Sequence, residues 1–256
     1  GVHQVRVALR RLRSLLRLFA PLLPEGFSEL WRDRLGDLAR ELSAARELDV
    51  LCDELLAPAE CGDAAWPAAL RQRLERERGT DRAAARELLA APRQGRVMLE
   101  FLAALYPATE VVMPGSPGLG DFAAARMARL RRRFRRRFDK LPAAPAEPWH
   151  ALRIAAKQLR YGLDFFAPLW PRKAVANYRR RLARIQADLG SIQDLDIAVQ
   201  RLREWSVTDP QCLADAQRLA GHHAGHVVTW RRNALRQARK LLAERPPWKR
   251  PLKADR

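Results

Sequence analysis

The sequence predicts an all-α fold built from a duplicated helical unit. Apolar residues recur with the 3.6-residue period of amphipathic helices along almost every long segment, and runs of β-branched residues are absent. Proline and glycine fall between the periodic blocks, where they end one helix before the next begins. A stretch near the start of the chain also recurs near its middle, which indicates an internal repeat.

Taken in order, the periodic blocks predict helices over residues 2–20, 28–56, 66–90, 94–106, 120–141, 149–167, 172–204 and 211–243. We expect breaks near Gly190 and Gly221, because glycine is a weak helix former. Two longer connections, 107–120 and 141–148, are rich in Pro, Gly and Ala. The second connection is the better boundary between halves. We therefore expect one domain over 1–256 made of a first bundle, 1–141, and a second, 148–245.

The repeat relates residues 3–22 to residues 150–169 at an offset of 147, with ten of twenty positions identical. The same offset brings Arg34 onto Arg181 and Asp49 onto Asp196. A match at an offset of 100 pairs Arg132 with Arg232 and Arg136 with Arg236. Because each amphipathic unit must bury its apolar stripe, we expect two bundles related by a pseudo-two-fold axis.

The charge balance is strongly positive, with 48 Lys and Arg against 29 Asp and Glu, a net charge of +19 and a pI of about 11.3. Because 48% of the residues are apolar, the chain can bury a core and carry this charge on a folded surface. Such a surface predicts a polyanionic partner: nucleic acid, an anionic membrane or a phosphate polymer. No segment is long and apolar enough to span a bilayer, so we expect no membrane insertion.

The first predicted helix carries a row of cations on one face, confined to an arc of about 80°. This row consists of His3, Arg6, Arg10, Arg13 and Arg17. The second copy repeats it with His150, Arg153, Lys157 and Arg160. Asp164 stands where the first copy has Arg17, so the second row is shorter. Leucines and phenylalanine occupy the opposite face of both helices, which predicts that the rows point away from the core.

A charged row is often only a solvated helix face, but such faces usually alternate in sign. Here like charges follow each other three and four residues apart, and each contact costs roughly 0.2–0.5 kcal/mol. We interpret this repulsion, repeated at matching positions, as a sign that an anion binds there. Further cations repeat in later helices and extend the predicted surface. They are Arg34, Arg181, Arg132, Arg136, Arg232 and Arg236.

The two helix-start histidines, His3 and His150, suit phosphate recognition as neutral hydrogen-bond donors, since a helix N-terminus disfavours imidazolium. Local capping or core packing is an equal alternative. Metal binding there is disfavoured because arginine or lysine follows at ligand spacing. His222 and His226 lie one turn apart and have the spacing to chelate, but no Glu stands between them for catalysis.

The sequence allows two roles for Asp49 and Asp196. Each either orients an arginine of the row or forms an intrahelical pair. The three cysteines are odd in number and irregularly spaced, which fits a reducing cytoplasm and neither a disulfide framework nor a zinc site.

The pattern His-x2-Arg-x3-[Arg/Lys]-x-Leu-Arg-x5-Phe, written twice and followed each time by a Leu-Asp motif, resembles the CHAD domain (conserved histidine α-helical domain). The resemblance implies two four-helix bundles related by pseudo-two-fold symmetry. It also implies binding of inorganic polyphosphate and localisation to polyphosphate granules. The ligand contacts that it implies come from His3, Arg6, Arg10 and Arg13 and from His150, Arg153, Lys157 and Arg160. Some members carry a CYTH triphosphatase domain with a Glu-x-Glu-x-Lys signature. This sequence has Glu75 and Glu77 at that spacing, but Gly79 stands where the signature has Lys, and the segment is a predicted helix. We therefore expect no such domain.

We find no Gly-rich phosphate loop, no carboxylate cluster for Mg²⁺ and no nucleophile beside a base in the sequence. We therefore predict a cytoplasmic, non-enzymatic polyphosphate-binding module without metal or cofactor. The alternative is an RNA- or DNA-binding basic bundle, which the same charge permits. A phosphohydrolase is the third class, and the missing acids argue against it. The sequence does not determine the oligomeric state.

Overall fold

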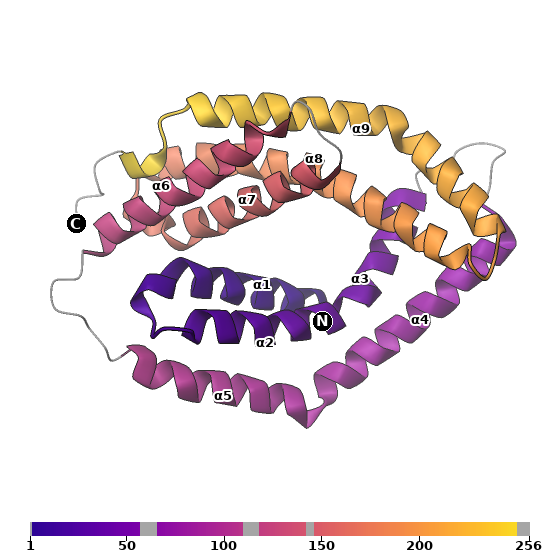
Figure 1. Cartoon of the computed structure of the whole chain (residues 1–256), viewed down its shortest axis with the longest axis horizontal. Helices are drawn as coiled ribbons and strands as arrows, with labels where there is room; N and C mark the ends of the chain where they lie inside the picture. Colours follow the sequence, from indigo (N-terminus) through magenta and orange to yellow (C-terminus); the bar gives the residue numbers. More distant parts are fainter. Residues whose placement is uncertain (1, 57–65, 110–117, 142–145, 250–256) are drawn as a thin grey trace. The chain divides into compact units, whose positions relative to one another are not determined.

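The computed structural model of the chain describes residues 2–56, 66–109, 118–141 and 146–249 (Figure 1). Within these ranges it does not describe the side chains of residues 2, 3, 43–46, 108, 109, 146 and 147. The described residues form helices joined by short connections and contain no strand, which confirms the all-α prediction.

The α-helices follow the predicted order. They are α1 (Val2–Phe19), α2 (Phe27–Glu41), α3 (Ser43–Val50), α4 (Ala68–Ala90), α5 (Pro92–Thr109), α6 (Leu119–Phe138), α7 (Ala146–Phe165), α8 (Arg172–Trp205) and α9 (Gln211–Ala243). A wide π-helical turn, Leu51–Leu56, extends α3, and 3₁₀ turns occupy Ala20–Leu22, Ala167–Leu169 and Pro247–Lys249. Among these described residues no helix has the length and apolarity to cross a bilayer.

Two details of the predicted helices were wrong. The single helix expected over 28–56 is α2, α3 and the π turn, because the backbone leaves helical geometry at the fully buried Leu42 (φ −85°, ψ 1°). Apolar periodicity does not predict this break, because the apolar pattern continues on both sides of it. The breaks expected at Gly190 and Gly221 are absent, and α8 and α9 continue through them. Glycine costs only about 1 kcal/mol against alanine in a helix.

The repeated sequences adopt the same local structure. The row helices α1 and α7 both end in a 3₁₀ turn of sequence Ala-Pro-Leu. The residue before each turn has nearly the same backbone angles, φ −94° and ψ 3° at Phe19 and φ −95° and ψ 6° at Phe166. The duplication read from the sequence is therefore visible in the backbone of these two segments.

The chain packs into two compact units, each discontinuous in sequence. Unit 1 comprises residues 1–112 and 194–224, and unit 2 comprises residues 113–193 and 225–256. These units do not coincide with the halves 1–141 and 148–245, because α6 packs with α7 in unit 2. The pseudo-two-fold arrangement of two bundles stays a prediction.

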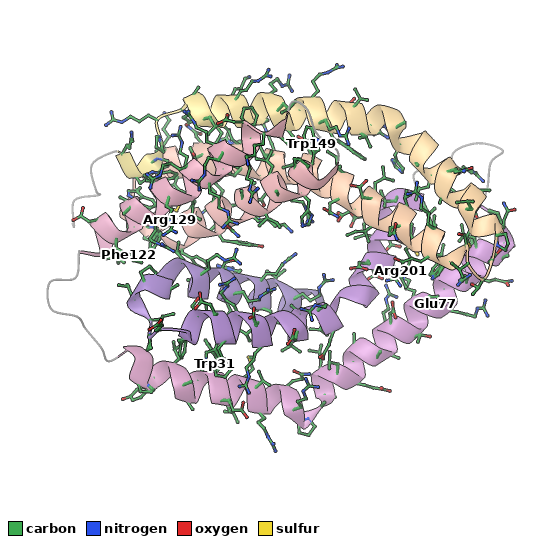
Figure 2. The ribbon with its side chains drawn as sticks, in the orientation of Figure 1. Trp31, Glu77, Phe122, Arg129, Trp149 and Arg201 are labelled. Carbon is green, nitrogen blue, oxygen red and sulfur yellow. The ribbon has the colours of Figure 1, made fainter. Side chains whose placement is uncertain are left out.

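The core of unit 1 lies between α1, α2, α4 and α5. Leu9 and Leu16 of α1 and Leu35 of α2 are buried in it. Trp31 of α2 packs edge-on against Phe101 of α5, with ring centroids 5.2 Å apart, and Figure 2 shows Trp31 between these two helices. Burial of these residues fixes which face of α1 points away from the core.

The core of unit 2 contains a chain of aromatic rings. Phe166 of the 3₁₀ turn region contacts Phe122 of α6 and Trp170, at centroid distances of 6.3 and 6.1 Å. Trp248 from the last 3₁₀ turn contacts Trp170 at 6.0 Å and Tyr178 of α8 at 5.3 Å. These contacts hold the segment after α9 against α8.

Candidate anion-binding surfaces

The α1 row lies in unit 1 on the face opposite the core, as predicted. The side chains of Arg6, Arg10, Arg13 and Arg17 are partly buried, while Leu9 and Leu16 on the other face are buried. The backbone of His3 begins the helix, but its side chain lies outside the described residues. Burial reaches the guanidinium groups themselves, because Nη1 of Arg6 and Nε of Arg10 are buried.

Arg13 is tied to α2. Its Nε donates a hydrogen bond to the carbonyl oxygen of Arg32 at 3.0 Å, and its guanidinium lies against the α2 backbone at Gly36. Burial lowers the pKa of Arg13, and the neighbouring charge of Arg32 lowers it further. Two guanidinium groups are therefore close enough to repel each other at the α1–α2 contact.

Arg10 forms no ion pair with the described residues of the chain. Its Nε is buried and has no hydrogen-bond acceptor among them. Since a buried guanidinium N–H without an acceptor is unfavourable, an anion reaching this side chain would meet a group with unused donors.

Arg34 is a predicted cation of unit 1 outside the α1 row. It lies on α2, and its charge is partly neutralised. It donates to Glu100 of α5 at 3.0 Å, with both side chains nearly half exposed. Its guanidinium also lies over the Trp31 ring, 5.1 Å from the centroid. An anion would have to compete with Glu100 for this arginine.

The α7 row lies in unit 2. Arg153, Lys157 and Arg160 are partly buried, and His150 is exposed. The Nδ1 atom of His150 donates to the Oε1 of Gln193. This contact uses the single N–H of a neutral ring and leaves Nε2 as an acceptor, so the hydrogen bond that we expected a neutral His150 to donate to phosphate goes to Gln193 instead. Asp164, which interrupts the row, forms an ion pair with Arg179 at 2.6 Å. The equivalent residues in the first copy, Arg17 and Arg32, are both cations.

The arginines of α6 form a dense exposed face in unit 2, near Arg129 in Figure 2. Arg132 and Arg136 are exposed and form no ion pair with the described residues. Burial lowers the pKa of Arg126, with a further contribution from Arg129. Arg131 has a different role, because it donates to the carbonyl oxygens of Leu242 at 2.5 Å and Glu244 at 3.4 Å.

The remaining predicted cations of unit 2 lie on α8 and α9. Arg181 donates from Nε to Glu244 at 2.8 Å and is therefore already paired with a carboxylate. Arg232 and Arg236 are exposed, and Arg236 donates to the side-chain oxygen of Asn233 at 3.1 Å. The nearby Tyr178 is deeply buried, which raises the pKa of its hydroxyl to about 12.

The partners of Asp49 differ from both sequence readings. Its carboxylate accepts from Arg78 at 2.8 Å and Arg82 at 2.6 Å, both on α4, and Arg78 also binds Asp53 at 2.6 Å. The expectation that Asp49 orients the row, or pairs within its own helix, was therefore wrong. Asp49 joins α3 to α4 instead. Asp196 is exposed on α8.

The histidine group on α9 does not assemble a metal site. His223 is buried, and its Nε2 lies 3.1 Å from the carbonyl oxygen of Leu55, so it has a packing role. His226 stacks on Trp230. Over the described ranges, no group of three or more His, Cys, Asp or Glu side chains could hold a metal ion.

Sequence reasoning missed two arginines that matter here. Arg32 supplies the carbonyl that holds Arg13 and adds a second charge beside it. The signal was present, since the offset of 147 pairs Arg32 with Arg179. Arg78 is the centre of the α3–α4 carboxylate network and has no such repeat partner to mark it.

Comparisons with known proteins identify the family of the fold. The sequence matches the CHAD domain family over residues 1–203. The structure is similar to the crystal structure of the CHAD domain from the plant Ricinus communis, with a TM-score of 0.83 and 30% sequence identity, covering 98% of this chain and 83% of that one. No curated protein matches the sequence. The match over most of the chain shows that this protein belongs to the CHAD domain family.

Proposed function

We propose that this chain is a non-enzymatic module that binds inorganic polyphosphate. The observation that carries the proposal is the pair of cation rows on α1 and α7, partly buried and backed by core leucines. Cations one helical turn apart are about 5–6 Å from each other, a spacing that an extended phosphate chain can follow. Family membership supports the same reading, and association with polyphosphate granules in the cytoplasm is the corresponding expectation for the cell.

Binding would use counterion release together with arginine forks on successive phosphates. Arg10 and the exposed α6 arginines, Arg132 and Arg136, have no acidic partner among the described residues. Arg34 and Arg181 would have to exchange a carboxylate for a phosphate, so they contribute less to affinity. Because polyphosphate has no bases, affinity should depend on chain length and salt.

The test is calorimetric titration with long-chain polyphosphate at several salt concentrations, beside a single-stranded RNA of equal phosphate count. We expect tighter binding of polyphosphate with a steep salt dependence. Equal or tighter binding of RNA would favour a general nucleic-acid binder. Metal-dependent release of phosphate from the polymer would instead show an enzyme.

A charge-reversal variant locates the site. Changing Arg6, Arg10, Arg153 and Lys157 to Glu should abolish binding while circular dichroism stays helical. The matched control changes four exposed cations elsewhere, Arg76, Arg86, Lys173 and Arg203, to Glu and alters the net charge equally. The row side chains are partly buried, so Glu at these positions could unfold the chain. A second variant with Gln at the same four positions removes the positive charges without introducing carboxylates. If the control loses as much affinity as the row variant, binding depends on net charge and the proposed site is wrong.

A further inference from the structure

The hydrogen bond between His150 and Gln193 fixes which nitrogen of the histidine ring a ligand meets. Nδ1 of His150, on α7, donates to Oε1 of Gln193, on α8, and both residues belong to unit 2. The histidine is exposed, so Nε2 is the nitrogen left for a ligand. In a neutral ring with its proton on Nδ1, Nε2 is an acceptor. A neutral His150 therefore offers an approaching anion an acceptor where the anion needs a donor.

The charges close to His150 in unit 2 are positive. Arg153 and Lys157 follow it by one and two turns on the same face of α7. Arg231 of α9 lies over the ring of the neighbouring Trp149, labelled in Figure 2, at 5.3 Å from its centroid. The contact from α8 is the neutral amide, and no charged side chain in the described part of α6, which also packs on α7, interacts with the histidine. Nearby cations and the start of a helix disfavour imidazolium, so we expect a neutral ring in the unbound protein.

A bound phosphate chain reverses this preference. The phosphates inside a polyphosphate chain are ionised at neutral pH and act only as acceptors, so they have no proton to share with Nε2. A phosphate beside the row stabilises imidazolium through its negative charge. In imidazolium both nitrogens are donors, so Nδ1 keeps its bond to Gln193 and Nε2 donates to the phosphate. Protonation thus turns Nε2 from an acceptor into a donor without moving the ring.

We propose that His150 binds phosphate as imidazolium, formed by taking up a proton when polyphosphate binds, and that Gln193 is the positioning residue that makes this proton necessary. The proposal rests on the proposed function, because polyphosphate supplies the anion. The proton comes from the buffer and forms the new Nε2–H bond. Since the bound state holds more protons than the unbound state, affinity must fall as the pH rises, by at most about tenfold per pH unit for one proton. The fall belongs to the range in which imidazole titrates, about pH 5 to 8.

Nitrogen NMR of the histidine rings tests the tautomer and its protonation. Near pH 7 the unbound protein should carry the His150 proton on Nδ1, and long-chain polyphosphate should convert the ring to imidazolium at the same pH. Loss of the signals in His150→Gln identifies them. A neutral ring with its proton on Nε2 in the unbound protein would overturn the proposal. A ring that stays neutral with polyphosphate bound would overturn it as well.

Calorimetry with long-chain polyphosphate, in two buffers of equal pH and different ionisation enthalpy, counts the protons taken up. Near pH 7 the wild type should take up more protons than His150→Gln, by up to about one per protein molecule. His222→Gln is the matched control, since this exposed histidine of α9 lies outside both rows, and it should take up as many as the wild type. Equal uptake by His150→Gln and the wild type would overturn this inference and leave the proposed function standing. A wild type that binds no polyphosphate would overturn both.

Gln193→Leu tests the positioning role. Without the acceptor at Nδ1, the neutral ring can carry its proton on Nε2 and donate to phosphate directly. Near pH 8 the variant should therefore bind polyphosphate several-fold more tightly than the wild type, and its affinity should depend less on pH. Loss of a purely structural contact would instead weaken binding equally at every pH. Gln72→Leu changes an exposed glutamine of α4 outside both rows and should keep the wild-type pH profile. The wild-type profile in Gln193→Leu would show that Gln193 does not control the ring.

Discussion

The guanidinium of Arg13 occupies the place where a side chain on Gly36 would begin: a Cβ at residue 36 would lie 2.9 Å from Nη2 of Arg13 and 3.1 Å from its Cζ. Glycine therefore lets an arginine of the α1 row cross the backbone of α2 and donate to the carbonyl of Arg32. The glycine is in the middle of α2 and has helical geometry, so the requirement here is space.

We expect Gly36→Ala to displace the Arg13 guanidinium and weaken its bond to Arg32. Alanine favours the helix by about 1 kcal/mol over glycine, which offsets this loss, so the variant alone should change the free energy of unfolding little. In an Arg13→Ala background the same substitution should stabilise by the full amount, about 1 kcal/mol. Urea unfolding of the wild type, Gly36→Ala, Arg13→Ala and the double variant gives the coupling free energy between Gly36 and Arg13. Equal effects in both backgrounds would show that Gly36 does not accommodate Arg13.

The Asp49 network predicts how unit 1 responds to acid. Burial alone would raise the pKa of Asp49, but its hydrogen bonds and charge contacts with Arg78 and Arg82 outweigh burial and lower that pKa. A carboxylate with a lowered folded-state pKa stabilises the fold above its unfolded value of 3.8, and this contribution is lost as the pH falls below that value. Stability should therefore decline on the acid side.

Asp49→Asn should lower the free energy of unfolding by about 1–2 kcal/mol at neutral pH, because it removes charged hydrogen bonds to two arginines. Near pH 2 the wild type has lost the same contribution, so the two proteins should converge. Asp37→Asn serves as control, since Asp37 forms an exposed ion pair with Arg40 of the same helix at 2.8 Å, and its loss should cost well under about 1 kcal/mol. Chemical unfolding across the pH range checks both. A constant difference between Asp49→Asn and the wild type would contradict the assignment.

The contrast between Asp49 and the α1 row shows what the sequence could reveal. The outward face of α1 was predictable, because the apolar period that buries Leu9 and Leu16 also fixes the opposite side of the same helix. The partners of Asp49 and Arg34 were not, since Arg78 and Glu100 are 29 and 66 residues away along the chain. Such pairs depend on how α3 meets α4 and how α2 meets α5. Helical periodicity carries no information on either contact.

Asp164 predicts that the α7 row binds polyphosphate less well than the α1 row. Its ion pair neutralises Arg179, whereas the first copy has Arg17 and Arg32 at the equivalent positions. Asp164→Arg should therefore raise the affinity for polyphosphate several-fold at low salt and steepen its salt dependence. Glu204→Arg is the matched control, since Glu204 is exposed and lies outside both rows. Calorimetry at several salt concentrations measures both variants. An equal gain in the control would assign the effect to net charge.

The pair Arg181 and Glu244 gives a test of whether a neutralised cation can join the site. Glu244→Gln removes the acceptor charge that Nε of Arg181 contacts at 2.8 Å, and it leaves a side chain of the same size. Both side chains are partly exposed, so the loss of stability should stay near about 1 kcal/mol or less. If Arg181 contacts the polymer, its release should raise the affinity more than Glu204→Gln does, which changes the net charge by the same amount. The salt dependence should also become steeper by about one phosphate contact. If Glu244→Gln and Glu204→Gln have the same affinity and the same salt dependence, Arg181 lies outside the site. The carboxylate of Glu244 would then not compete with a bound phosphate.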